Sequence, residues 1–215
     1  KQNFTSMMKS CLYDLKDYLL KPLEASKSKD TEDIKKVAMN GAIISLVMTI
    51  ITLFKTMISV VRVTEFSWLK GSVTVWRFEN LKNLNYFSLI FKNFFIYALV
   101  ILALAFVFYV GSLIIKKQVS YQKYVSFVLI SFIPTILGGM ILTSLINIIS
   151  IHLGVIVAIL SSVYTITILV TLINDELKLE GYQKVLFNAI CFGVILCISY
   201  LGIINISLPG IFQSK

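Results

Sequence analysis

Five long runs of apolar residues limit what this chain can fold into more than any other feature of its sequence. They lie at Val37 to Val61, Phe94 to Ile115, Val125 to Ile149, Leu153 to Ile173 and Val185 to Ile206. A helix needs about 20 apolar residues to cross a hydrocarbon core of about 30 Å, and it satisfies its backbone polar groups without water. The sequence therefore predicts an all-α fold, a polytopic membrane helix bundle with five transmembrane helices.

The overall composition is that of a membrane protein rather than of a soluble domain. Hydrophobic residues make up 57% of the 215 residues and charged residues 14%, whereas roughly 45–50% and about 25% are usual in soluble domains. The formal net charge is +9, and the Lys and Arg side chains flank the apolar runs, where they suit anionic lipid headgroups better than nucleic acid. We therefore expect membrane lipids with anionic headgroups as partners, and no nucleic acid.

The distribution of Lys and Arg predicts an orientation in the membrane. The segments on the side of the N-terminus carry 13 of these residues, and the opposite side carries 7. Because cytoplasmic loops are enriched in positive charge, we expect a cytoplasmic N-terminus and an external C-terminus. The chain then divides into a cytoplasmic segment and linker (1–36), a membrane domain (37–206) with an external loop (62–93), and a short tail (207–215). The sequence starts at Lys1 rather than at Met, which leaves open a domain upstream.

A further helix is predicted ahead of the first span. From Phe4 to Leu20, apolar residues recur at helical spacing with Lys and Asp between them, and the helix should end before Pro22. Two placements fit this amphipathic pattern: an interfacial helix on the inner membrane surface, or a helix packed on the protein's own cytoplasmic face. Asp30 or Thr31 should cap the helix of the first span. The apolar residues are Phe4, Met8, Cys11, Leu12, Leu15, Tyr18 and Leu19.

The expected external loop is rich in aromatic residues and holds both tryptophans, Trp68 and Trp76. Such residues gather at the level of the lipid headgroups, so anchoring at the membrane surface is the simpler interpretation and a ligand-binding loop is the alternative. Alternating apolar residues near Val73 predict a short hairpin that turns at 70–71. Asn80 is a candidate cap for a helix leading into the second span.

A row of small and hydroxylated residues runs along the third span. Helices in membranes approach closely where small residues align, so we interpret the row as a helix-packing ridge. Pro134 has no N–H for the carbonyl of Ile130 and should kink the helix beside this ridge, either for packing or, alternatively, as a gating hinge. The second span carries bulky aromatics instead, so we expect it at the lipid-facing edge, with Ala105 exposed to lipid. The ridge residues are Ser131, Thr135, Gly139, Thr143 and Asn147.

The last three spans contain no Asp, Glu, Lys or Arg. A charge inside the membrane is costly and is usually retained only for function. His152, the one histidine in the sequence, has no second His or carboxylate beside it, and Cys11, Cys191 and Cys197 form no C-x-x-C pair. We therefore expect no catalytic residues, no metal and no cofactor.

Three stretches of the chain resemble a known family. They are "DYLLKPLEA" before the first span, "SYQKYVSFVLISFIP" entering the third and "LEGYQKVLFNAI" entering the fifth. With the five-span layout they resemble the Yip1-like family of integral membrane proteins, in its bacterial branch, over about 12–206. The resemblance places Tyr121, Pro134, Gly181 and Lys184 at positions of the family pattern.

The resemblance implies a scaffold rather than an enzyme. Eukaryotic members look like scaffolds that bind small Rab GTPases, but their D-L-Y-G-P signature is absent from this sequence. The sequence has 18 Lys and only 2 Arg. This ratio is typical of an AT-rich bacterial genome, which favours a plasma membrane location. The leading hypothesis is a non-enzymatic membrane scaffold or adaptor that recruits a protein partner on its cytoplasmic face or organises and bends the membrane, with a homo-oligomer as an option. The alternative is a permease or channel component of a membrane transport system.

Overall fold

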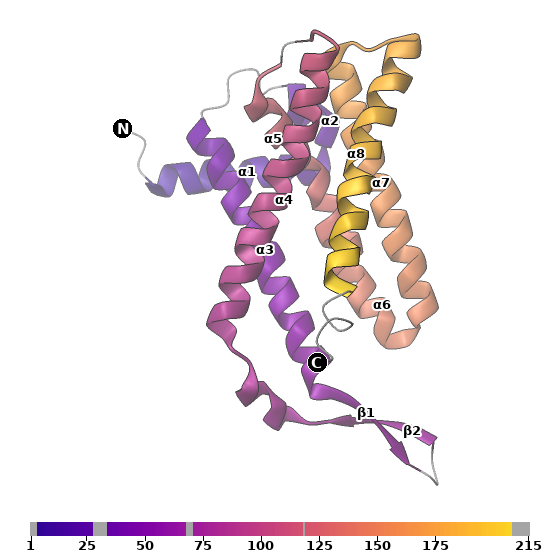
Figure 1. Cartoon of the computed structure of the whole chain (residues 1–215). Helices are drawn as coiled ribbons and strands as arrows, with labels where there is room; N and C mark the ends of the chain where they lie inside the picture. The colour runs from indigo at the N-terminus through magenta and orange to yellow at the C-terminus, as the bar shows by residue number, and fades with distance from the viewer. Residues whose placement is uncertain (1–3, 28–33, 68–70, 118, 208–215) are drawn as a thin grey trace, which may run out of the picture.

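The computed structural model describes residues 4–27, 34–67, 71–117 and 119–207, and helices dominate these residues (Figure 1). The expected caps Asp30 and Thr31, and the tail beyond Ser207, lie outside the described residues. The elements are α1 (Phe4–Leu20), α2 (Pro22–Lys27), α3 (Ile34–Val61), β1 (Arg62–Ser67), β2 (Gly71–Trp76), the 3₁₀-helix η1 (Phe78–Asn83), α4 (Tyr86–Ile114), α5 (Tyr121–Pro134), the π-helix η2 (Thr135–Leu142), α6 (Thr143–Ile149), α7 (Ile151–Leu177) and α8 (Gly181–Ser207).

Within the described residues, four helical segments are long and apolar enough to cross a membrane. They are Ile34–Val61, Tyr86–Ile114, Tyr121–Ile149 and His152–Leu177, and a shorter apolar helix covers Gly181–Cys197. The prediction of a helical membrane protein with several spans is therefore confirmed. A fifth crossing by α8 stays a prediction.

The spans form an up-and-down bundle with two distinct ends (Figure 1). At one end α4 and α7 finish and α5 and α8 begin, close to α1 and α2; we call it the α1 end. At the other end the β1–β2 hairpin extends from α3 and the chain turns from α6 into α7; we call it the hairpin end. Spans that follow one another in the chain are therefore antiparallel, as short connections between membrane helices require.

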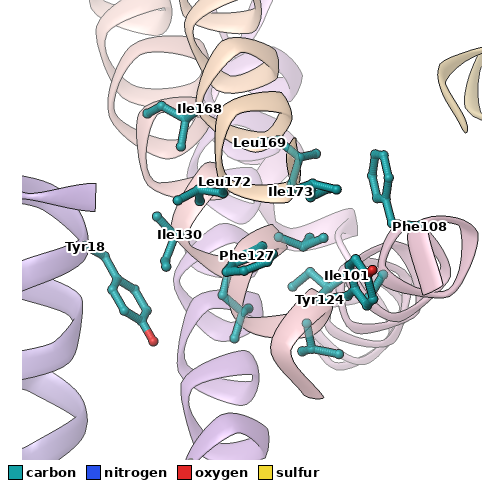
Figure 2. Packing of buried hydrophobic residues seen from close by; sticks show 14 of the residues in the cluster. Tyr18, Ile101, Phe108, Tyr124, Phe127, Ile130, Ile168, Leu169, Leu172 and Ile173 are labelled. Carbon is teal, nitrogen blue, oxygen red and sulfur yellow. The ribbon is translucent and has the colours of Figure 1, made fainter. Parts of the chain in front are cut away.

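The first part of the third span, α5, is the centre of the bundle. The eight consecutive residues from Tyr124 to Ser131 are buried, and α5 contacts α1, α2, α3, α4 and α7. A helix that is buried all round has neighbours on every side. Figure 2 shows Tyr124, Phe127 and Ile130 in this core, with Leu172 and Ile173 of α7 nearby.

The expectation that the second span lies at the lipid-facing edge is wrong for one of its faces. Ala105 is fully buried, and so are Ile101, Phe108 and Gly111. These residues lie one helical turn apart on α4 and face α3, α5 and α8. The bulky aromatics are on the remaining surface, where Phe91, Phe95 and Phe106 are among the exposed side chains.

The N-terminal helix α1 lies across the bundle rather than along it (Figure 1). It contacts α3 and α5, and Cys11 and Tyr18 are buried in these contacts. Of the predicted apolar face, Leu12 and Leu19 remain exposed. Packing against the protein's own helices thus accounts for part of the amphipathic pattern, and placement in the membrane interface stays a prediction for the exposed part.

The predicted hairpin is present at the far end of α3. Strands β1 and β2 pair antiparallel, from Arg62 opposite Trp76 to Ser67 opposite Gly71. The predicted cap at Asn80 is wrong, because Asn80 lies in η1 and its side-chain N–H donates to Val60 O. Asn85 caps α4 instead, five residues later, by accepting a hydrogen bond from Ser88 N.

Candidate functional site

The third span changes its helical geometry at Pro134. The chain is α-helical as far as Pro134, π-helical from Thr135 to Leu142 and α-helical again from Thr143. Proline has no N–H to donate and its ring crowds the carbonyl four residues earlier, so the α-helical bonding pattern cannot continue there. π-Helical turns are rare and often mark functional positions, which makes this segment the first candidate site.

Hydrogen bonds within and around the π-helix hold it in place. The N–H of Thr143 donates to Gly138 O, five residues earlier, and Thr143 Oγ1 donates to the same carbonyl at 2.8 Å. From α7, Ser161 Oγ donates to Pro134 O at 2.8 Å. The hydroxyls of Thr135 and Thr165 are 2.9 Å apart and share another hydrogen bond between the two helices.

The π-helix and α7 approach closely at Gly138, one residue before the glycine of the predicted ridge. A Cβ atom on Gly138 would lie 2.5 Å from Ser161 Oγ, whereas a Cβ on Gly139 would lie 3.7 Å from it. A distance below 3.0 Å is a clash, so α7 packs against the bare backbone of Gly138. We call the contact between Gly138 and Ser161, with the Thr135–Thr165 pair, the π seam.

The structure distributes the ridge residues over different surroundings. Ser131 is buried in α5, where its hydroxyl donates to Val128 O. Thr143 closes the end of the π-helix. Asn147 is exposed, but its side chain occupies the space that a Cβ on Gly154 of α7 would need. The i+4 spacing assumes 3.6 residues per turn, and the π-helix breaks that assumption in the middle of the row.

A second cluster of polar residues lies at the α1 end of the bundle, where sequence reasoning placed only loops. Lys123 Nζ of α5 is 2.7 Å from Glu176 Oε1 of α7, and both side chains are largely buried. Asn188 Nδ2 of α8 donates to Asn174 Oδ1 at 3.3 Å. These contacts join the ends of α5, α7 and α8, so the cluster fixes how these three helices meet at this end of the bundle.

Tyr124 points into the same region from the centre of the bundle. Its side chain is fully buried, and Ser112, Cys191 and Glu176 are among the groups near its hydroxyl. The Ser112 hydroxyl donates to Tyr109 O, and the Tyr124 hydroxyl makes no hydrogen bond of normal geometry among the described residues. The sequence signal for this cluster was that Lys123 and Glu176 lie at span ends on the same predicted side.

The positions that the family resemblance singled out separate into two places. Tyr121 opens α5 and its hydroxyl donates to Leu102 O of α4 at 2.8 Å. Gly181 and Lys184 are exposed in the first turn of α8, and Gly181 has a φ of +52°. Of these four positions, only Pro134 contacts the π seam, because its carbonyl accepts the hydrogen bond from Ser161 Oγ.

The residues that could bind a metal or act as nucleophiles are dispersed over the described part of the chain. No three His, Cys, Asp or Glu side chains there are placed to share a metal ion. Cys11 and Cys191 are buried free thiols, Cys197 is an exposed one, and His152 is exposed at the start of α7. The two clusters described above are therefore the candidate functional sites.

The comparison with known families assigns the chain. A family model, the Yip1 domain, matches residues 16–204. The chain belongs to the Yip1 family. No curated protein and no solved structure matches the chain. The match covers every described membrane span, the π seam and the polar cluster, so both candidate sites lie within the Yip1 domain. The chain is thus an integral, multi-pass membrane protein of this family.

Proposed function

We propose that this Yip1-family protein is a non-enzymatic membrane scaffold or adaptor that recruits a protein partner, or organises and bends the membrane, at its α1 end. The observation that carries the proposal is the way α1 is held. Lys36 Nζ of α3 lies 2.7 Å from Asp14 Oδ2 of α1, and Asn40 Nδ2 donates at 3.5 Å to both Asp14 Oδ2 and Tyr18 Oη. We call these contacts the α1 clamp.

The α1 clamp sets which side of α1 faces outward. With Tyr18 and Cys11 buried, an apolar group remains exposed on α1 and α2, consisting of Leu12, Tyr13, Leu19, Leu20 and Leu23. Contiguous exposed apolar side chains typically mark a site that binds a protein or a membrane. A scaffold needs such a surface in a fixed orientation, and the α1 clamp supplies it.

The apolar interior of the spans supports a role without catalysis. Between Val125 and Ile173, and between Val185 and Ile206, the sequence has no Asp, Glu, Lys or Arg. Membrane enzymes and ion-coupled carriers usually retain ionisable groups at that depth. Two charged pairs, Lys36–Asp14 and Lys123–Glu176, lie instead at the α1 end, where each joins two helices.

The test of the scaffold is affinity capture from native membranes in mild detergent. We expect a partner at about one copy per chain, and we expect Leu12→Glu with Leu20→Glu to abolish its recovery because both side chains are on the exposed face of α1. Matched substitutions at the hairpin end, Trp76→Glu with Phe78→Glu, change exposed apolar residues outside the membrane spans and far from α1 and should leave capture unchanged. Equal recovery with all three proteins would contradict a partner site on α1.

We further propose a plasma membrane location, a cytoplasmic N-terminus and an external C-terminus, as the distribution of Lys and Arg predicts. Cysteines placed at Ser28 and Gln213, both outside the described residues, report the two sides. An impermeant thiol reagent on intact cells should label the cysteine at 213 and not the one at 28. The reverse pattern would invert the orientation.

A second candidate function is a permease or channel component, which the π-helix favours. Irregular helix at membrane depth is tolerated where it is buried in protein or lines a cavity, and broken helices form the substrate sites of many transporters. In this case a nucleotide-binding subunit should be captured with the chain, and its recovery should not depend on the exposed residues of α1. That result would favour transport over the scaffold.

A further inference from the structure

An apolar groove runs beside the π seam on the surface of the bundle. Its walls are the π-helix and α7, and the end of α1 and the start of α2 close one end of it. Its volume is about 440 Å³, within the roughly 300–1,000 Å³ typical of small-molecule sites. The groove shares Tyr18 with the α1 clamp, and its lining includes no residue of the polar cluster around Lys123.

The π-helix shapes one wall of the groove. In a π-helix the hydrogen bonds join residues five apart, so Leu137 and Leu142 lie above one another on this wall, and both are exposed. Leu160 and Tyr164 of α7, also exposed, form the facing wall. A regular α-helix would rotate Leu142 away from Leu137, because residues five apart differ by about 140° at 3.6 residues per turn.

The position of the groove indicates the chemistry of its occupant. Both walls belong to membrane spans, and their exposed leucines continue into the rest of the lipid-facing surface. The medium around the groove is therefore hydrocarbon chains rather than water. Beside Pro22, which closes the groove, Lys21 pairs with Glu24 at 3.0 Å, and both side chains are largely exposed. Exposed pairs of this kind are weak, so the Lys21 ammonium can also bind a phosphate.

We propose that this groove is a specific site for one membrane glycerophospholipid, with an acyl chain between the π-helix and α7 and the phosphate near Lys21. Because the groove opens into hydrocarbon, the acyl chain gains van der Waals packing against both walls rather than transfer out of water. Lipids that merely surround the protein gain no such enclosure. The bound lipid would make the junction of α1 and α2 part of a protein–lipid surface.

The experiment measures lipid that stays with the purified full-length protein. The protein is reconstituted in vesicles of phosphatidylethanolamine and phosphatidylglycerol, extracted in mild detergent, and examined by native mass spectrometry. We expect one retained phospholipid per chain. Leu160→Trp should lower its occupancy several-fold, since the indole fills the groove. Ile159→Trp is the matched control, because Ile159 is the neighbouring residue, 56% exposed against 63% for Leu160, and lies outside the groove lining.

A second pair of variants tests the other wall in case Leu160→Trp fails to fold. Leu142→Trp should also reduce occupancy, and Ile141→Trp, which is outside the lining, should not. A phospholipid with a photoreactive acyl chain should label 133–142 and 157–164 more than the exposed face of α4. Equal lipid retention by the groove variants and their controls, or even labelling over all lipid-facing surfaces, would overturn the proposal and leave only surrounding lipid.

Discussion

Replacing Gly138 by alanine tests the π seam with the smallest change available. The new Cβ would lie 2.5 Å from Ser161 Oγ and 2.9 Å from Ser161 Cβ. Serine has a short side chain, so Ser161 cannot move its end aside without losing its 2.8 Å hydrogen bond to Pro134 O. Either α7 shifts away from the π-helix, or this hydrogen bond breaks.

The size of the effect follows from these contacts. Overpacking typically costs about 1–3 kcal/mol, and loss of a hydrogen bond costs about 0.5–1.5 kcal/mol more. The higher helix propensity of alanine offsets about 1 kcal/mol of this loss in stability. We therefore expect Gly138→Ala to lower the free energy of unfolding by about 1–3 kcal/mol, which corresponds to a fall in Tm on the order of 5 °C for a chain of this length.

Gly139→Ala is the matched control in the adjacent position. Its Cβ would lie 3.7 Å from Ser161 Oγ and 3.8 Å from Thr135 Cγ2, which are ordinary contact distances. The gain in helix propensity is the same, so Gly139→Ala should leave Tm unchanged or raise it. Thermal unfolding of the detergent-solubilised protein, followed by exposure of buried thiols, gives both values.

A double-mutant cycle separates the seam from a general effect on the helix. Ser161→Ala removes the hydrogen bond to Pro134 O and the atom that Gly138→Ala meets most closely. In that background Gly138→Ala should therefore cost less, with a coupling of about 0.5–1.5 kcal/mol. Equal effects of Gly138→Ala and Gly139→Ala, or strict additivity in the cycle, would refute the tight approach of α7 to the π-helix.

Two further predictions concern the other contacts between spans. Gly111→Ala should lower Tm, because its Cβ would lie 2.6 Å from Cys191 Sγ and 3.0 Å from Phe187 Cε2, both in buried side chains, and Gly193→Ala, which meets nothing within 4 Å, should leave Tm unchanged. Lys123→Met should destabilise the protein by about 1–3 kcal/mol, because it leaves the Glu176 carboxylate, 29% exposed, without its partner. The double variant Lys123→Glu with Glu176→Lys, which exchanges the two charges, should restore part of the lost stability. Stability of Lys123→Met equal to wild type would show that the pair is not structural.

The sequence predicted the membrane spans well because span length depends on local composition alone. The hydrocarbon thickness demands about 20 apolar residues wherever a helix crosses. The described spans begin and end within four residues of the predicted boundaries, except that α4 begins at Tyr86 rather than at Phe94. The face that each span turns to its neighbours was harder to predict. On α4, Ala105 is buried and the adjacent Phe106 is exposed. Because lipid is as apolar as the protein interior, a buried face and a lipid-exposed face do not differ in hydrophobicity, and the sequence does not distinguish them.

The candidate sites were predicted in part, and the failures have a common cause. Pro134 was expected to disturb the third span, but its effect was expected to be a kink. A kink leaves the i+4 row intact on each side, whereas a π-helix shifts the row, so that Gly138 rather than Gly139 meets Ser161. Ser161 and Thr165 have no distinguishing pattern of their own, since hydroxyl residues in a membrane helix usually bond to the carbonyl four residues earlier, as Ser162 and Thr167 do here.

The position of the π-helix explains why one span can be both the centre of the bundle and its least regular helix. The α-helical half, α5, is buried from Tyr124 to Ser131, and a proline there would leave a buried carbonyl without its helical N–H donor. The irregular half begins where α7 supplies Ser161 for Pro134 O, and where Thr143 bonds to Gly138 O. Helix breakers are therefore tolerated at Pro134 and Gly138 because hydroxyl donors are present there, and moving the proline into the buried half should abolish folding.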